Sequence, residues 1–205
     1  MLSTDILFLD GEFTKLRGEL LELAIVDYNG DTIYFQRFRP KNSKEWKRTE
    51  RIHHITPEMV KDCPFVEQER EKIQAIINKA KVVISKNISS DRLVLNKEGI
   101  NIPRVFDIQL LEDLLLKNEK TLSLKDLAKS FGEDDNLANW HCSKDDAFVT
   151  YCLFLDLMIM FREKYTECPS DQLKAIRYVK QRFYKNKYVR RQKAKGIVKK
   201  QKKKQ

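Results

Sequence analysis

The chain has 205 residues, of which 41% are hydrophobic and 34% are charged, and its formal net charge is +10. This length and apolar content suit one domain of ordinary size with an appendage, and they exclude global disorder. The four cysteines show no C-x-x-C spacing, which excludes a zinc site of that type and a disulfide framework and favours a reduced, cytoplasmic setting. Because Asp5 and Asp10 interrupt the first apolar stretch, we expect neither a signal peptide nor a membrane span.

The charge is distributed unevenly along the chain. Residues 171–205 contain fifteen Lys or Arg and one acid, whereas residues 1–170 contain twenty-five bases and twenty-nine acids. A mildly acidic body therefore precedes a strongly basic end, and such an end favours an anionic polymer or surface as its partner. We divide the chain into a domain at residues 1–165 and an extension at 166–205, which we expect to hold a basic helix and a disordered, lysine-rich tail.

Three predicted strands come first in the chain, and two more follow later. Three of them form a meander, with the Asn29-Gly30-Asp31 turn as a strong hairpin signal between the second and third. Two further short apolar runs alternate with helical segments, which predicts a central five-stranded mixed sheet flanked by helices, an α/β fold. The predicted strands are Ile6–Phe13, Leu20–Tyr28, Thr32–Phe38, Val82–Ser85 and Arg104–Ile108.

The predicted helices follow the meander. Residues 41–52 are polar and basic, which indicates a loop or a short irregular helix, and Thr56-Pro57 marks the start of a helix. The longer helical segments are Val66–Lys79, Ser89–Lys97, a helix ending near Lys117, Leu122–Ser130 and Lys144–Phe161.

Two carboxylates on the first strand are the main chemical signal. Side chains two residues apart on a strand point the same way, so Asp10 and Glu12 project together from one face. Two buried like charges raise each other's pKa or bind a cation, and an all-oxygen site suits a divalent metal. Alone, a D-x-E pair is weak evidence, because short motifs match often by chance.

Three later residues strengthen that signal. Asp91 follows the fourth strand, where loops that lead into helices often build sites, and His141 stands five residues before Asp146 at the start of the last helix. Each acid also has a plainer interpretation as a helix cap or first-turn residue. Together with Asp10 and Glu12, the set resembles the DEDD exonucleases of the ribonuclease H-like fold, in the DnaQ-like subgroup whose base is a histidine.

The resemblance covers residues 4–162 and implies a mechanism. It implies that Asp10, Glu12, Asp91 and Asp146 hold two divalent ions, Mg²⁺ or Mn²⁺, and that His141 accepts the proton of the attacking water. It implies hydrolysis of phosphodiester bonds from the 3′ end of a single strand. DNA and RNA are not distinguished by any motif.

The resemblance also implies substrate contacts. Phe13 and Leu16 would stack or wedge against the terminal base, with a packed core position an equal alternative for the aromatic ring, and Asn87 would contact the substrate. Relatives usually carry a histidine where this chain has Lys86, and an aromatic residue where it has Ser90. Because of that departure, the packing of the helix that carries Asp91 and its contact with the substrate backbone stay open. Lys86 either contacts a phosphate or is solvated.

Two alternatives to the enzyme remain at the sequence level. One is a catalytically inactive exonuclease fold that binds nucleic acid or ribosomes, and the other is a proofreading subunit whose basic extension binds a polymerase or ribonucleoprotein. The intact motif residues argue against the inactive protein. We expect the extension to add nucleic-acid affinity through its charge, with no membrane partner.

Overall fold

The structure is a computed structural model that describes residues 2–116, 120–132 and 138–165. The expected basic helix and lysine-rich tail at 166–205 lie outside the described residues, as does the expected end of a helix at Lys117. No helix among the described residues is long and apolar enough to cross a membrane.

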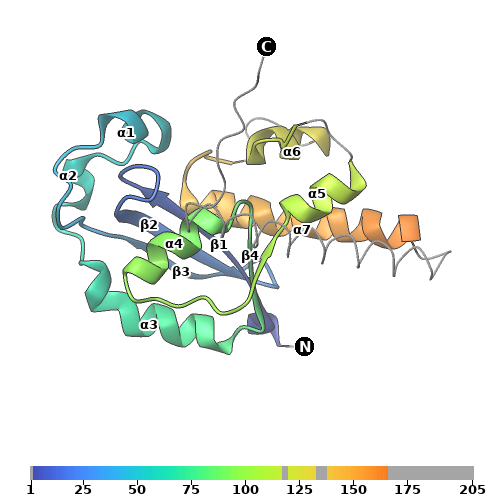
Figure 1. Cartoon of the computed structure of the whole chain (residues 1–205), viewed down its shortest axis with the longest axis horizontal. Coiled ribbons are helices and arrows are strands. Elements are labelled where there is room, and N and C mark those ends of the chain that lie inside the picture. The colour runs from blue at the N-terminus through green and yellow to red at the C-terminus, as the bar shows by residue number, and fades with distance from the viewer. Residues whose placement is uncertain (1, 117–119, 133–137, 166–205) are drawn as a thin grey trace, which may run out of the picture.

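A five-stranded mixed sheet forms the centre of the molecule (Figure 1). Its strand order is β3-β2-β1-β4-β5; β1 pairs antiparallel with β2 and parallel with β4, so β1 is central. This confirms the predicted sheet. The strands are β1 Ile6–Phe13, β2 Leu20–Asp27, β3 Thr32–Arg37, β4 Val82–Ser85 and β5 Val105–Asp107.

Helices cover both faces of the sheet. A short 3-10 turn, η1 (Ser3–Asp5), precedes β1. The helices are α1 Lys47–His53, α2 Pro57–Val60, α3 Val66–Lys79, α4 Ser89–Lys97, α5 Gln109–Leu115, α6 Leu124–Ser130 and α7 Ser143–Tyr165. The bounds predicted for β1, β4, α3 and α4 are confirmed, and α7 extends four residues beyond the predicted Phe161.

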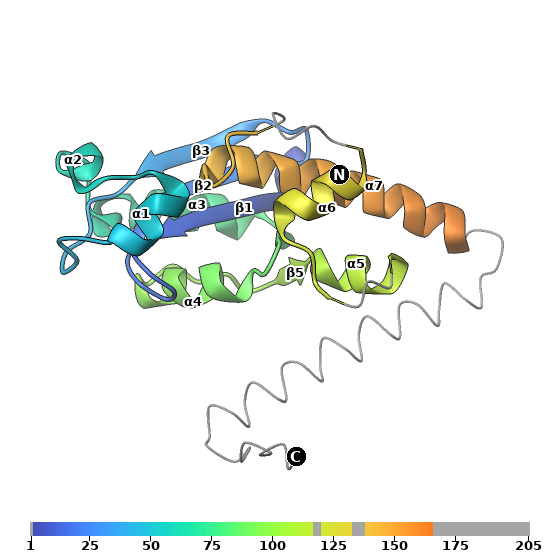
Figure 2. The same cartoon turned by 90° about the horizontal axis from the view of Figure 1, so that it is seen from above.

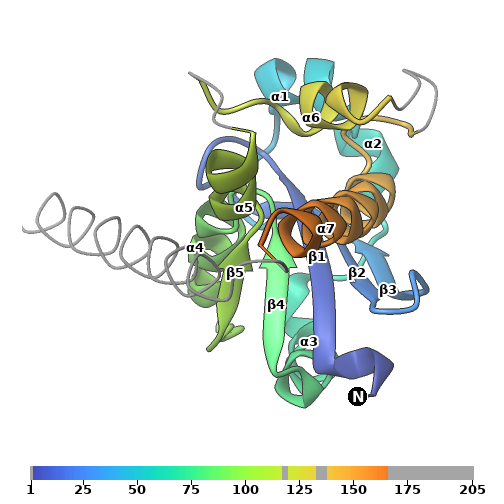
Figure 3. The ribbon, with the colours of Figure 1, turned by 90° about the vertical axis from the view of Figure 1, so that its right-hand side faces the viewer.

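Strand alternation divides the core into two layers. Leu7 and Leu9 of β1 pack with α3 and α4, whereas Phe8 packs with α5, α6 and α7 on the opposite face. In Figure 3, α3 accordingly lies on the other side of the sheet from α5, α6 and α7. The ring of Phe8 meets the ring of Tyr151 edge-on at 5.2 Å, which fixes α7 against the central strand.

The polar segment after β3 contains a regular helix. Residues 47–53 form α1, which ends at His54 in the left-handed conformation, with φ of 58°. Buried Trp46 anchors the segment, since its indole Nε1 donates a hydrogen bond to the Ile55 carbonyl at 2.6 Å. α1 lies beside the end of β1 in two perpendicular views (Figures 1 and 2).

Candidate functional site

Asp10 and Glu12 lie on the sheet face that α7 covers. Phe8, Asp10 and Glu12 are each two residues apart on β1, so their side chains point to the same face of the sheet. The ring of Phe8 packs against α7 on that face, and both carboxylates therefore lie on the same side. The β1–β2 register shifts between Glu12 and Phe13, and such irregularities re-aim side chains at a strand end. The predicted pair therefore stands at the end of the central strand.

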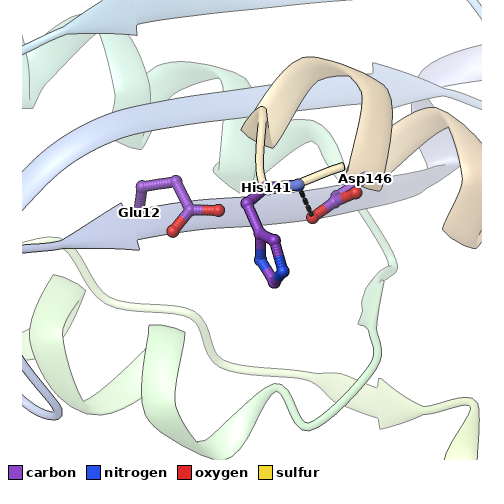
Figure 4. Close-up of side chains that lie close together, drawn as sticks. All are labelled: Glu12, His141 and Asp146. Carbon is purple, nitrogen blue, oxygen red and sulfur yellow. Dashed lines mark hydrogen bonds between the residues drawn. The ribbon is translucent and has the colours of Figure 1, made fainter. Parts of the chain in front are cut away.

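Glu12 meets two residues from the other end of the domain. One potential ligand atom from each of Glu12, His141 and Asp146 lies within 4.8 Å of the others, and Figure 4 shows the three side chains gathered beside β1. The amide of His141 donates to Asp146 Oδ2 at 3.2 Å. Asp145 turns elsewhere, since its Oδ2 accepts a hydrogen bond from the Asn139 amide at 2.9 Å. The geometry therefore selects Asp146 over its neighbour.

Asp91 approaches the same strand from α4. It is buried, it accepts a hydrogen bond from the Gly11 backbone, and its charge raises the pKa of Asp10. A side chain at residue 11 would stand 3.3 Å from the Glu22 carbonyl oxygen, so glycine lets β1 and β2 come close at this point. All four predicted acids thus converge on the end of β1.

Burial of these carboxyl groups, with their mutual repulsion, raises their pKa values. Desolvation and nearby acids raise the pKa of Glu12 to about 9 and those of Asp91 and Asp146 to about 7. The pKa of Asp10 is raised well above its ordinary value for the same reasons. Asp146 Oδ1 is buried and has no hydrogen-bond partner among the described residues. Excess negative charge and a buried acceptor without a donor fit a divalent cation held by oxygen ligands.

His141 occupies a backbone conformation that is unusual for its residue type. Its φ is 65°, in the left-handed region, and its side chain is exposed at the mouth of the site. Desolvation, followed by the charges of His54 and Lys125, lowers the pKa of its imidazole. A neutral imidazole can accept a proton or bind a metal.

Buried Glu22 positions the start of α7. Its Oε1 accepts hydrogen bonds from both the amide and the hydroxyl of Ser143, each at 2.9 Å, and its Oε2 accepts one from Arg37 Nε at 2.8 Å. One carboxylate therefore joins β2, β3 and the helix that carries Asp146. The sequence analysis did not predict the role of Ser143, because it is 121 residues away from Glu22 and stands at a variable position between His141 and Asp146.

A second buried ion pair supports the segment before Asp91. The side chain of Lys86 is only 10% exposed, and its Nζ pairs with the fully buried carboxylate of Glu112 rather than standing free in solvent. The other oxygen of Glu112 accepts a hydrogen bond from the Leu122 amide at 2.9 Å. Asp107 Oδ1 accepts a hydrogen bond from the Asn87 amide at 3.0 Å. Glu112 and Asp107 were also missed by the sequence analysis, although acids inside apolar segments are a usable signal.

The structure separates the three expected substrate residues. Leu16 is 79% exposed on the loop after β1, whereas Phe13, the last residue of β1, is partly buried against the core. Asn87 is exposed and has φ of 61°, in the loop that leads to α4. The side chains of Leu16 and Asn87 are thus exposed to a ligand, whereas the ring of Phe13 packs partly in the core.

The sheet order, the flanking helices and the carboxylate site define an α/β protein of the ribonuclease H-like class. The model of the exonuclease family (RNase_T) matches residues 7–154, more than half of the chain. The chain therefore belongs to the exonuclease family. A search of curated protein sequences found no match.

Solved structures agree with this assignment at the level of the fold. Exonuclease X in complex with 5′ overhanging duplex DNA is 24% identical, with a TM-score of 0.58 over 75% of this chain and 91% of that one. The 3′-exonuclease solved for recognition of a histone mRNA stem-loop is 12% identical, with a TM-score of 0.61 over 75% and 81%. The Neurospora crassa Pan2 catalytic unit is 19% identical, with a TM-score of 0.64 over 85% of this chain and 30% of that one.

Proposed function

We propose that this protein is a divalent-metal-dependent 3′–5′ exonuclease that removes nucleotides from the 3′ end of DNA or RNA. The observation that carries the proposal is the approach of Glu12, His141 and Asp146 to within 4.8 Å, with Asp10 and Asp91 buried beside them. Family membership limits the reaction class to nucleic-acid hydrolysis.

The acids and the histidine take different roles in this proposal. Asp10, Glu12, Asp91 and Asp146 would hold two Mg²⁺ or Mn²⁺ ions, which when bound supply charge neutralisation at the attacking and leaving oxygens. His141 accepts the proton of the attacking water through its exposed imidazole. Its lowered pKa keeps the ring neutral, and therefore able to accept a proton, at neutral pH.

Both nucleic acids are candidate substrates. Structures with this fold include one with duplex DNA that carries a 5′ overhang and one that recognises a histone mRNA stem-loop. Those nucleic acids belong to the neighbouring structures, and the sequence of this chain holds no motif that selects the sugar.

The test is digestion of matched DNA and RNA oligonucleotides labelled at the 5′ end, with Mg²⁺ or Mn²⁺ added after chelation. A ladder that shortens from the 3′ end is expected for the wild type, and a 3′-blocked oligonucleotide should resist. Asp10→Ala and His141→Ala should each lower the rate by at least about a hundredfold. Wild-type activity no greater than that of these variants on every substrate would favour the nucleic-acid-binding alternative and overturn the enzyme.

A further inference from the structure

The exposed side of α1 carries positive charges that the folded domain does not neutralise. Lys47 pairs with Glu45 at 3.1 Å, but within residues 2–116, 120–132 and 138–165 neither Arg48 nor Arg51 has a side-chain partner. Because they are three residues apart on a helix, these two arginines share one side of it. Lys15, on the loop after β1, is also exposed. We call Lys15, Arg48, Arg51 and His54 the α1 surface.

Several contacts hold this surface beside the catalytic strand. Thr49 Oγ1 donates a hydrogen bond to the Thr14 carbonyl at 2.8 Å, and Thr14 follows the last residue of β1. At the same N-terminal end of α1, the buried N-cap residue Trp46 packs with Leu21 and Ile55. The helix is therefore docked on the end of β1, two residues from Glu12, rather than on a distant part of the domain (Figure 2).

A hollow lies at the C-terminal end of α1. It has a volume of about 430 Å³ and is lined by Glu50, Arg51, His54 and Thr56. The charge of His54 lowers the pKa of His141, so the two imidazoles are within electrostatic reach of each other. Among the residues that line the hollow, Glu50 is an acid, whereas Arg51 and His54 are basic.

The basic α1 surface stands out because the rest of the body is acidic. Residues 1–170 contain more acids than bases, and the site itself is a cluster of carboxylates. A polyanionic strand that enters such a site needs compensating cations close to its path. Arginine is well suited to that task, because its planar guanidinium binds phosphate oxygens in a bidentate manner.

We propose that the α1 surface binds backbone phosphates of the substrate strand on the 5′ side of the scissile linkage. This inference rests on the proposed function and assigns that strand a path across α1, toward the site at the end of β1. The affinity it supplies belongs to the folded body and is separate from the basic extension at 166–205.

The test compares two charge reversals in the full chain. Arg48→Glu/Arg51→Glu alters the α1 surface, and Lys79→Glu/Arg104→Glu is the matched control. Lys79 ends α3 and Arg104 precedes β5, so both lie at the opposite ends of the parallel strands from the site, and both are exposed. Each pair changes the net charge equally. Binding of a labelled 15-nucleotide single strand is measured in EDTA across a salt series.

The α1 pair should weaken binding at least about tenfold and reduce the log–log salt slope by about 1.4, the value for two lost phosphate contacts on a single strand. The control pair should change affinity less than about threefold. Equal losses in the two pairs would mean that only net charge matters, and no loss in the α1 pair would remove the surface from the binding path; either result overturns the proposal. Arg48→Gln/Arg51→Gln, which avoids new repulsion, should give an intermediate loss.

A dinucleotide substrate separates this inference from the proposed function. It has no strand on the 5′ side of its single linkage, so the α1 pair should hydrolyse it at the wild-type rate while losing activity on the 15-nucleotide strand. Loss on both substrates in a variant that melts like the wild type would overturn the assigned path. Absence of wild-type hydrolysis on both would count against the exonuclease instead, while the binding comparison would still decide the role of the α1 surface.

Discussion

Asp146 shows most clearly that the site carries more negative charge than the protein alone can stabilise. Its Oδ2 accepts only the His141 amide among the hydrogen bonds described, and its Oδ1 is buried without a donor. Desolvation, then the nearby acids Asp145 and Glu22, raise its pKa to about 7. The folded state without metal is therefore strained electrostatically at this residue.

Asp146→Asn should stabilise the metal-free protein by roughly 1–3 kcal/mol at pH 8, because it removes one charge from a repelling cluster. The same variant should lose the increase in Tm that Mg²⁺ gives to the wild type, since one ligand charge is missing. Urea denaturation in EDTA and thermal melting with Mg²⁺ measure the two effects.

Asp145→Asn is the matched control for that charge removal. Asp145 is adjacent on α7, but its carboxylate accepts a hydrogen bond from the Asn139 amide. Its replacement should leave the metal response intact and stabilise the protein less than Asp146→Asn. A metal-free Asp146→Asn protein that is less stable than the wild type would contradict the electrostatic account.

Individual site residues were predictable to different degrees. Asp10 and Glu12 follow from strand alternation, which is a local property of the chain. Asp91, His141 and Asp146 required the order and spacing of a family motif. The partnership of Glu22 with Ser143 could not be predicted, because it depends on how α7 docks across a separation of 121 residues.

At the scale of elements, Glu22 determines where α7 begins relative to the sheet. It holds Ser143 at the first turn of that helix and Arg37 on β3. In Glu22→Gln, the remaining side-chain oxygen can still accept the hydrogen bonds from Ser143, but the new amide NH2 group faces the Arg37 guanidinium, which is also a donor. We expect this change to lower the free energy of unfolding by about 1–3 kcal/mol. The rate of hydrolysis should fall as well, because Asp146 and His141 are positioned by the same helix start.

Arg37→Gln is the informative comparison for that prediction. It removes the cation, whose side chain is 35% exposed, and leaves both bonds from Ser143 to Glu22. We expect a loss of stability at least as large, because the buried Glu22 carboxylate is left without its counter-charge, but a rate within about twofold of the wild type, because Ser143 stays bonded to Glu22. Equal rate losses in the two variants would show that the charge pair, and not the helix anchor, matters for positioning.

The buried pair of Lys86 and Glu112 links the loop before α4 to α5. Glu112→Gln should destabilise the protein by about 3–5 kcal/mol, because it leaves a nearly buried ammonium without its counter-charge. Lys86→Met/Glu112→Gln should recover most of that loss, since the glutamine oxygen still accepts the Leu122 amide and no charge stays buried. Urea denaturation of the two single variants and the double variant measures the coupling. A double variant that loses as much as the sum of the singles would contradict it.

Most elements follow from local patterns, and the exceptions have physical causes. The apolar runs of β1 and β4 and the 3.6-residue period of α3 gave correct bounds, whereas β2, β3 and β5 are shorter than predicted by one residue at one or both ends. α6 begins at Leu124 rather than Leu122 because Ser123 caps it, with its hydroxyl accepting from the Asp126 amide at 3.1 Å. The regularity of α1 was not predicted, because its stability comes from Trp46 and Thr49, which contact residues outside the helix.

At the scale of the whole molecule, two parts of the chain supply positive charge that bears on binding a strand. One is the α1 surface on the folded body, and the other is the extension at 166–205, which is rich in lysine and lies outside the described residues. The sequence alone indicated a binding role only for the second, because a run of lysines is visible in composition, whereas Lys15 and Arg51 belong to two segments that the hydrogen bond from Thr49 to Thr14 joins.

These two sources of charge should act independently on a long strand. Replacing the five lysines of the segment 199–204 with glutamine in the full chain removes five positive charges that can contact phosphates of a strand of about 30 nucleotides. We expect this change and Arg48→Glu/Arg51→Glu to weaken binding of the long strand by free energies that add, since sites without shared partners are additive. Measured across a salt series, the combined variant should also lose the sum of the two slopes. A combined loss smaller than that sum would mean that both segments bind the same phosphates, and the extension would then compete with the α1 surface for one stretch of the strand.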